Sequence, residues 1–323
     1  MIDDRTRSAI ESADTDELLR IVDGHCEARA WDRLAQLRSH CRAAVERGKQ
    51  VWAIDEHIRY RLALEAPGEI AAEVVAEGPA RFTLGPLPEV ASSTHAWDEL
   101  EPHLPPGPER SIVAHECVAR GAELEGADID PLVLELPLRR LAWEPHYPMA
   151  RYEAHRAEFP EPETPSMSAL DVRHEMSRLP TDDAADALLS LVMPWVEEST
   201  GRAEVAAAPG DLADALGALG VRRAAAAPIE PAEAMAWMAW AAASGGTHGR
   251  RRGMAAGRFG AWWAAAAVTD LEWPPDPNEL GRRLASLDWH VWTDGTSTGW
   301  NLRLAVHREG ITRVVAAVDA PAA

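Results

Sequence analysis

DWHVWTDGTSTGWNLRLAVHREGITRVVAAVD, residues 288–319, closes the chain with a pattern typical of β-strands. Three runs rich in aromatic, β-branched and aliphatic residues are separated by Asp294-Gly295 and by Glu309-Gly310. Such pairs are typical of tight hairpin turns, because glycine readily adopts the positive φ that these turns require. The pattern predicts antiparallel strands over residues 288–292, 300–307 and 311–319.

The preceding segment adds a strand–helix–strand motif to this sheet. Residues 202–228 read RAEVAAAPGDLADALGALGVRRAAAAP, in which Asp211 is placed to cap a helix and Gly220 to end it. Residues 167–323 are therefore predicted to form an α+β domain with a small, mostly antiparallel sheet. Its further helices are predicted over residues 182–198, 231–243, 253–267 and 277–287.

Residues 1–121 show a helical pattern instead. Apolar residues recur three and four positions apart, as in Leu34, Leu37 and Cys41, and Gly48 follows as a stop. Several such helices joined by short loops predict an antiparallel helical array, either solenoid-like or an irregular bundle. The chain as a whole is predicted to be α-rich.

Residues 122–166 separate these two domains. They contain seven prolines, which interrupt long helices and central strands. We interpret them as a proline-rich linker or an extended arm, with one short strand predicted over residues 132–136.

The charge of the chain is strongly negative. It carries 52 acidic residues against 32 basic ones, a formal net charge of −20. Such a surface disfavours binding to nucleic acid and to anionic membranes, and it favours binding to a protein partner with a basic surface. The three cysteines do not indicate a disulfide framework, and neither a signal sequence nor an apolar run of membrane-spanning length is recognised. A cytoplasmic location without membrane attachment is therefore expected.

One window breaks the acidic pattern. No acidic residue occurs between Glu233 and Asp270, and this window contains SGGTHGRRRGMAAGRFGAWW, residues 244–263. Backbone N–H groups ahead of a helix, together with guanidinium groups, are suited to hold phosphate or carboxylate oxygens. The anion-binding hypothesis names Ser244, Thr247, His248, Arg250, Arg251, Arg252 and Arg258.

The same window also has a packing interpretation. Gly249, Gly253, Gly257 and Gly260 lie three or four residues apart, so on a helix they would form a smooth face for close contact. The arginines would then pair with carboxylates elsewhere in the fold. The tryptophans that flank the loop have two interpretations as well, an aromatic wall for a ligand or part of the core. They are Trp237, Trp240 and Trp262.

Metal and catalytic motifs are not recognised. Each cysteine has a histidine beside it or two residues away, but adjacent helical residues point about 100° apart and rarely ligate one ion together. His115-Glu116 begins like a zinc-protease motif, yet Ala119 stands where the second histidine is required. We therefore predict no metal and no cofactor, and the sequence leaves open whether the protein is an enzyme.

Four runs of the C-terminal half carry a family resemblance: WAAASGGTHGRRRGMAAGRFGAWW, LEWPPDPNELG, TGWNLRLAV and VVAAVDA. Over about residues 200–320 the chain resembles uncharacterised actinobacterial proteins, which implies a bacterial, cytoplasmic protein and no particular activity. The leading functional interpretation is a non-enzymatic interaction or adaptor protein. The alternative is a C-terminal domain that binds a phosphorylated small molecule or nucleotide through the arginine- and glycine-rich loop.

Overall fold

The computed structural model describes residues 2–174, 176–296 and 298–320 and divides the chain into two compact units. The first, the helical unit, comprises Met1–Cys117, Asp128–Asp130 and Ala150–Glu158. The second, the sheet unit, comprises Val118–Ala127, Pro131–Met149 and Phe159–Ala323. Residues 122–166, predicted as a linker or arm, thus contribute to both units.

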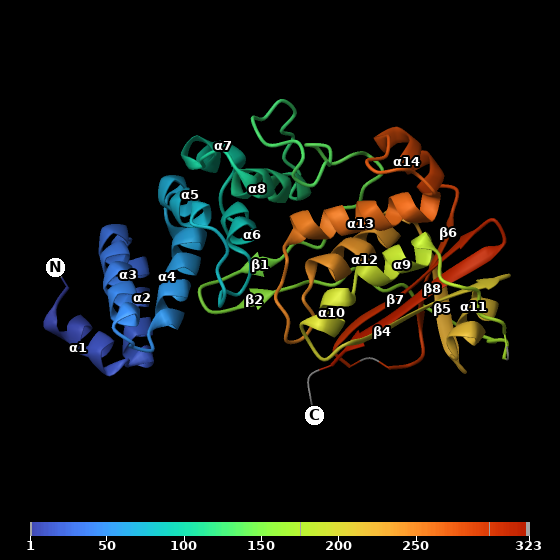
Figure 1. Ribbon diagram of the computed structural model, residues 1–323, viewed down its shortest axis with the longest axis horizontal. Coiled ribbons are helices and arrows are strands. Elements are labelled where there is room, and N and C mark those ends of the chain that lie inside the picture. Colours follow the sequence, from blue (N-terminus) through green and yellow to red (C-terminus); the bar gives the residue numbers. More distant parts are fainter. Residues whose placement is uncertain (1, 175, 297, 321–323) are drawn as a thin grey trace. The chain divides into compact units, whose positions relative to one another are not determined.

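Helices that pack on their neighbours in the chain make up most of the helical unit (Figure 1). Their bounds are α1 Asp4–Ser12, α2 Thr15–Glu27, α3 Trp31–Glu46, α4 Trp52–Glu65, α5 Gly68–Ala76, α6 Leu87–Ser92, α7 Trp97–Leu100, η1 Glu101–His103 and α8 Pro108–Ala119. An antiparallel hairpin of β1 (Arg151–Tyr152) and β2 (Ala157–Glu158) completes the unit.

Capping carboxylates explain where the first helices begin. Asp3 accepts a hydrogen bond from the Thr6 backbone N–H (2.7 Å), and Asp14 accepts one from that of Glu17 (3.0 Å). Side chains at the three-and-four spacing, such as Leu37, are fully buried. The α-helices of this unit range from 4 residues in α7 to 16 in α3, which is more irregular than a uniform repeat.

The sheet unit is organised around one six-stranded antiparallel sheet with the order β3-β5-β6-β7-β8-β4. The strands are β3 Ser168–Leu170, β4 Arg202–Pro209, β5 Ala224–Ile229, β6 Asp288–Thr293, β7 Trp300–Arg308 and β8 Ile311–Asp319. The helices are α9 Asp183–Ser190, α10 Met193–Glu197, α11 Leu212–Leu219, α12 Pro231–Ala243, α13 Met254–Thr269 and α14 Pro277–Leu284.

The two faces of the sheet are covered unequally (Figure 1). On one face, α9, α12 and α13 share a large apolar core with strand residues such as Leu304 and Val315. On the other face, the short helix α11 packs Leu212 and Leu216 against small strand residues such as Ala305. Successive residues of a strand point to opposite faces, so each strand contributes to both layers.

The predictions for the end of the chain are confirmed. Strands β6, β7 and β8 cover the three predicted ranges, and Arg308 pairs with Ile311 across the Glu309-Gly310 turn. Both turn residues have positive φ, 51° and 79°. The strand–helix–strand motif of residues 202–228 is also observed, as β4, α11 and β5.

Other predictions are corrected. The fold is mixed α+β rather than α-rich, because the sheet organises the larger unit. Residues 132–134 lie in a turn and residues 135–136 are irregular, so no strand forms there; Leu134 and Glu135 have φ of 67° and 51°. The helix predicted over residues 182–198 is two helices, and Pro194 stands in the first turn of the second, where its missing N–H is tolerated. The edge strand β3 was not predicted.

Within the described ranges, no helix is both long enough and apolar enough to cross a lipid bilayer.

Candidate functional site

The glycine-rich loop between α12 and α13 does hold a carboxylate, but that carboxylate belongs to the protein itself. The Asp319 side chain is fully buried at the end of β8. It accepts hydrogen bonds from the Thr247 backbone N–H (2.5 Å), the Ser199 hydroxyl (2.6 Å) and the Thr200 hydroxyl (3.1 Å). The Ser244 hydroxyl is buried and accepts from Gly246 within the loop. These groups are therefore engaged in fixing the loop to the sheet.

The arginines proposed to bind an anion do not converge on one point. Arg252 pairs with Glu198 at 2.9 Å, and the guanidinium of Arg251 lies 4.7 Å from the centre of the Phe159 ring. Arg250 is exposed, as is His248. Arg258 is fully buried in a bidentate ion pair with Glu144. This contact corrects the assignment of Arg258 to a ligand site. The guanidinium groups are thus dispersed over local partners.

The flanking tryptophans belong to the core. Trp240 and Trp262 are each 1% exposed, and Trp237 is 7% exposed. Trp240 stacks on Trp300 with ring centres 5.1 Å apart, and the indole N–H of Trp262 donates to Glu144 at 3.1 Å. The aromatic-wall interpretation is corrected accordingly, because these faces are covered by protein.

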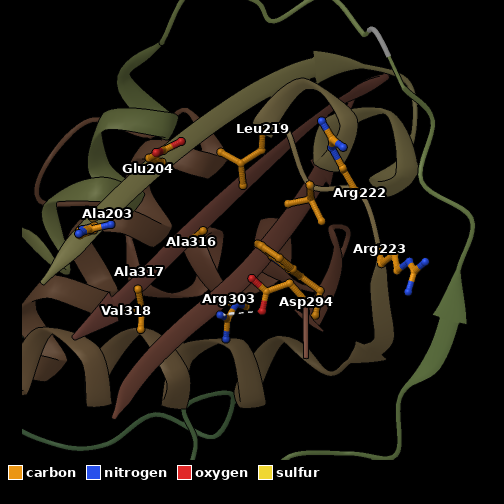
Figure 2. Close-up of a pocket in the computed structure, with 14 residues that line it drawn as sticks. Ala203, Glu204, Leu219, Arg222, Arg223, Asp294, Arg303, Ala316, Ala317 and Val318 are labelled. Atoms are coloured by element: carbon orange, nitrogen blue, oxygen red, sulfur yellow. Dashed lines mark ion pairs between the residues drawn. The ribbon is translucent and has the colours of Figure 1, made fainter. Parts of the chain in front are cut away.

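A different site is open on the α11 face of the sheet, where a pocket of about 540 Å³ is found (Figure 2). Helix α11 has eight residues, about 12 Å of helix, whereas β7 and β8 have nine residues each, about 30 Å of strand. The helix therefore covers only part of this face. Beyond its end at Gly220, small side chains such as Ala316 leave a hollow.

One row of residues crosses the strands beneath this hollow. The sheet register places Arg303 of β7 opposite Ala316 of β8, and Ala316 opposite Glu204 of β4. The guanidinium carbon of Arg303 lies 5.7 Å from the ring centre of Trp292 on β6, and its Nη2 lies 2.9 Å from Asp294 Oδ1. Figure 2 shows this ion pair within the pocket. A cation is therefore held in the floor, against an aromatic ring.

Several protein groups hold Arg303: besides its ion pair with Asp294, its Nη1 donates to the backbone oxygen of Thr296 (3.1 Å) and to Asn301 Oδ1 (3.0 Å). Its side chain is 9% exposed, and burial lowers the pKa of Arg303 more than the Asp294 carboxylate raises it. The pKa of Asp294 is itself lowered, because the backbone N–H of Thr296 and the charge of Arg303 outweigh the effect of burial. Arg303 remains protonated at any physiological pH. An additional negative group near the floor would stabilise it.

Three further arginines, all exposed, line the same pocket. Arg222 and Arg223 follow the C-terminus of α11 and lie at the rim in Figure 2, while Arg202 begins β4. Among the described lining residues, four arginines stand against Glu204 and Asp294, a formal charge of +2 in a chain of charge −20. Long, flexible guanidinium side chains at an opening are suited to close over phosphate or carboxylate groups.

The pocket wall also carries an unsatisfied donor. The Trp292 indole Nε1 is buried and has no hydrogen-bond acceptor in the described structure. Because this nitrogen is covered by protein atoms, the pocket contacts Trp292 through other atoms of the residue.

A second pocket, of about 420 Å³, has the opposite charge. It lies between α9 and α13 and is lined by Trp263 and Trp273, whose ring centres are 5.3 Å apart. Trp263 is 43% exposed. The charged side chains that line it are all carboxylates: Asp183, Asp186 and Asp270.

The sequence contained a weak signal for the first pocket, hereafter the arginine pocket, which is lined by Arg202, Arg222, Arg223 and Arg303. Arg222-Arg223 comes one residue after the helix stop Gly220, and Arg303 lies on the face of its strand opposite Leu302 and Leu304. Neither signal links these positions to Arg202. Only the strand order places β4, β7 and α11 around one hollow.

Comparison with known proteins identifies a family but no activity. The chain belongs to a family of unknown function (DUF6183), whose model matches residues 16–320. The family match therefore includes most of the helical unit as well as the C-terminal half. No curated protein and no solved structure matches the chain.

Proposed function

We propose that the sheet unit binds a small organic anion, bearing phosphate or carboxylate groups, in the pocket formed by α11 and strands β4, β6, β7 and β8. The observation that carries this proposal is the excess of arginine around one hollow, with Arg303 in the floor and the exposed Arg202, Arg222 and Arg223 around it, against only Glu204 and Asp294 among the described lining residues. The proposal keeps the ligand class suggested by the sequence and moves it from the loop at residues 244–252 to another face.

The size and chemistry of the pocket support this ligand class. Pockets for small molecules commonly measure about 300–1,000 Å³ and combine apolar walls with a few polar groups. Leu219 and Val221 supply apolar wall, Trp292 supplies aromatic surface, and the arginines supply charge. A nucleotide or sugar phosphate satisfies all of these features.

Isothermal titration calorimetry with ADP, inorganic pyrophosphate and citrate tests the proposal. We expect saturable binding of at least one of these anions. The double variant Arg222→Ala, Arg223→Ala should weaken it about tenfold or more, since a charge-assisted hydrogen bond is worth about 1.5–3 kcal/mol and tenfold is about 1.4 kcal/mol.

The matched control is the double variant Arg250→Ala, Arg252→Ala. It removes the same charge from the same unit at the loop that the sequence suggested. Unchanged affinity in this control assigns binding to the sheet pocket. Equal losses of affinity in the two double variants would contradict the proposal, and so would the absence of binding of all three anions.

A second function is favoured by the acidic aromatic pocket. We propose that Trp263 and Trp273 receive an arginine or lysine side chain from a protein partner, which corresponds to the adaptor role suggested by the sequence. An exposed tryptophan face beside Asp183, Asp186 and Asp270 attracts a cation both through the ring and through the carboxylates.

Fluorescence anisotropy with a labelled hexa-arginine peptide at physiological salt tests this second function. Trp263→Ala should lower the affinity at least about threefold, because a cation–π contact contributes about 0.5–2 kcal/mol. Trp52→Ala removes a similarly exposed tryptophan, 40% exposed, from the helical unit and serves as the control. Equal affinities for the two variants would indicate only diffuse attraction to an acidic surface.

A further inference from the structure

Three side chains with metal-ligand chemistry meet within the helical unit. Asp23 lies on α2, His57 lies on α4, and His155 lies in the turn between β1 and β2. The potential ligand atoms of the three all lie within 4.8 Å of one another. His155 Nε2 is 3.0 Å from Asp23 Oδ1, and the two imidazole rings are 5.5 Å apart and nearly parallel, with 14° between their planes.

The His57 ring carries a nitrogen that the protein does not use. Its Nε2 is buried and has no hydrogen-bond partner in the described structure. An imidazole nitrogen without a protein partner is available to ligate an ion. A neutral imidazole offers a lone pair, which is the form that binds metals.

The surroundings hold the carboxylate ligand in place. Arg61 is hydrogen-bonded to Asp23, and its Nε lies 2.7 Å from Glu65 Oε1. Carboxylates that ligate metals are commonly oriented by such outer hydrogen bonds. Because Glu65 balances the charge of Arg61, the negative charge of Asp23 remains available to a cation.

We infer that Asp23, His57 and His155 form a binding site for a divalent transition-metal ion of the zinc class. Two imidazole nitrogens and one carboxylate oxygen are a ligand set that zinc accepts, with a fourth position left for water. In a tetrahedral zinc site with bonds of about 2.0–2.1 Å, ligand atoms lie about 3.3 Å apart. Separations near the 4.8 Å limit of this cluster must therefore shorten, whereas the 3.0 Å between His155 and Asp23 already fits. His155 can move, since its side chain is 55% exposed and stands in a hairpin turn.

The consequence for the fold is a cross-link. These ligands lie far apart in sequence, so one ion would fasten the hairpin at residues 150–158 to α2 and α4. An ion that binds only the folded chain stabilises it in proportion to RT ln(1 + [L]/Kd).

The test uses full-length protein freed of metal with a chelator, titrated with Zn²⁺ by calorimetry and followed by thermal denaturation. We expect one strong site per chain and a rise in the melting temperature with Zn²⁺. The same protein loaded with Co²⁺ should show the visible absorption of tetrahedral cobalt with nitrogen and oxygen ligands.

His155→Ala is the informative variant, because the exposed side chain is removed without opening the core. It should weaken Zn²⁺ binding at least about tenfold and abolish the thermal shift. His40→Ala, which removes an exposed histidine beside Cys41 in the same unit, should leave both unchanged. Asp23→Asn should behave as His155→Ala does.

Two outcomes would overturn the inference. One is the absence of a strong site in the metal-free wild-type protein. The other is binding of several ions per chain that His155→Ala does not weaken, which is what scattered surface carboxylates would give.

Discussion

Glu144 and Arg258 form a fully buried ion pair, with Nε 2.7 Å from Oε2 and Nη2 2.8 Å from Oε1. The guanidinium also donates to the carbonyl oxygens of Pro137 and Arg139, both at 2.9 Å. This pair fastens the segment at residues 131–149 to α13. The segment interpreted as a proline-rich linker or an extended arm therefore includes a fixed part of the sheet unit.

Breaking this pair should be costly. Glu144→Gln keeps the shape but leaves the Arg258 charge without its counter-ion in the core, and we expect a loss of about 3–5 kcal/mol in the free energy of unfolding. The control Glu198→Gln breaks the exposed pair with Arg252 and should cost less than about 1 kcal/mol. Urea denaturation of both variants measures the difference, and similar losses would contradict the assignment of a buried pair.

Stability should fall in acid, in part through Asp182. The hydrogen bond from Arg313 foremost lowers the pKa of Asp182, and burial only partly opposes it. A carboxyl with a lowered folded pKa contributes its stability above the unfolded value of about 3.9, and this contribution is lost as the pH falls through the folded pKa. Asp182→Asn retains a helix-capping side chain but removes the charge. We expect the variant to be less stable than wild type at pH 7 and to approach it by pH 3.

Thermal denaturation at pH 7, 5 and 3 checks this prediction. Asp276→Asn is the control, because Asp276 caps α14 and has no arginine partner in the described structure. The difference in stability between Asp276→Asn and wild type should stay small at all three pH values. A stability gap between Asp182→Asn and wild type that is as large at pH 3 as at pH 7 would argue against the charge pair.

Gly246 should be intolerant of a side chain. Its φ is 78°, and a Cβ there would collide with the Asp319 carboxylate. Gly310 has nearly the same φ, 79°, but open space around it. Gly310→Ala should therefore cost only the backbone strain of about 1–2 kcal/mol, and Gly246→Ala should cost clearly more. Equal melting temperatures for the two variants would show that the loop does not depend on its contact with Asp319.

Filling the arginine pocket should block it without changing its charge. Ala316 is half-buried in the floor between Arg303 and Glu204. Ala316→Leu adds bulk to an open hollow, so we expect a stability change within about 1.5 kcal/mol and loss of binding of the anion found by calorimetry. Retained binding with unchanged affinity would mean that the anion does not use the floor.

Much of the sheet unit was predictable from the sequence, because its signals are local. Alternation of residues and the Glu309-Gly310 turn identified β7 and β8, and Asp211 and Gly220 bounded α11. Such signals need only neighbouring residues, since strand periodicity and turn conformation are properties of short segments. The edge strand β3 was missed because its pairing with β5 is not encoded nearby.

The sites were decided by the tertiary structure. The sequence identified an arginine-rich window, but it could not tell that Arg258 meets Glu144, more than a hundred residues away, or that Thr247 meets Asp319. Strand order brought Arg202, Arg222 and Arg303 around one hollow, and helix packing brought Asp23 near His57 and His155. Charge and periodicity can be read along a chain, whereas burial and convergence depend on which distant segments pack together, and only the folded structure sets that.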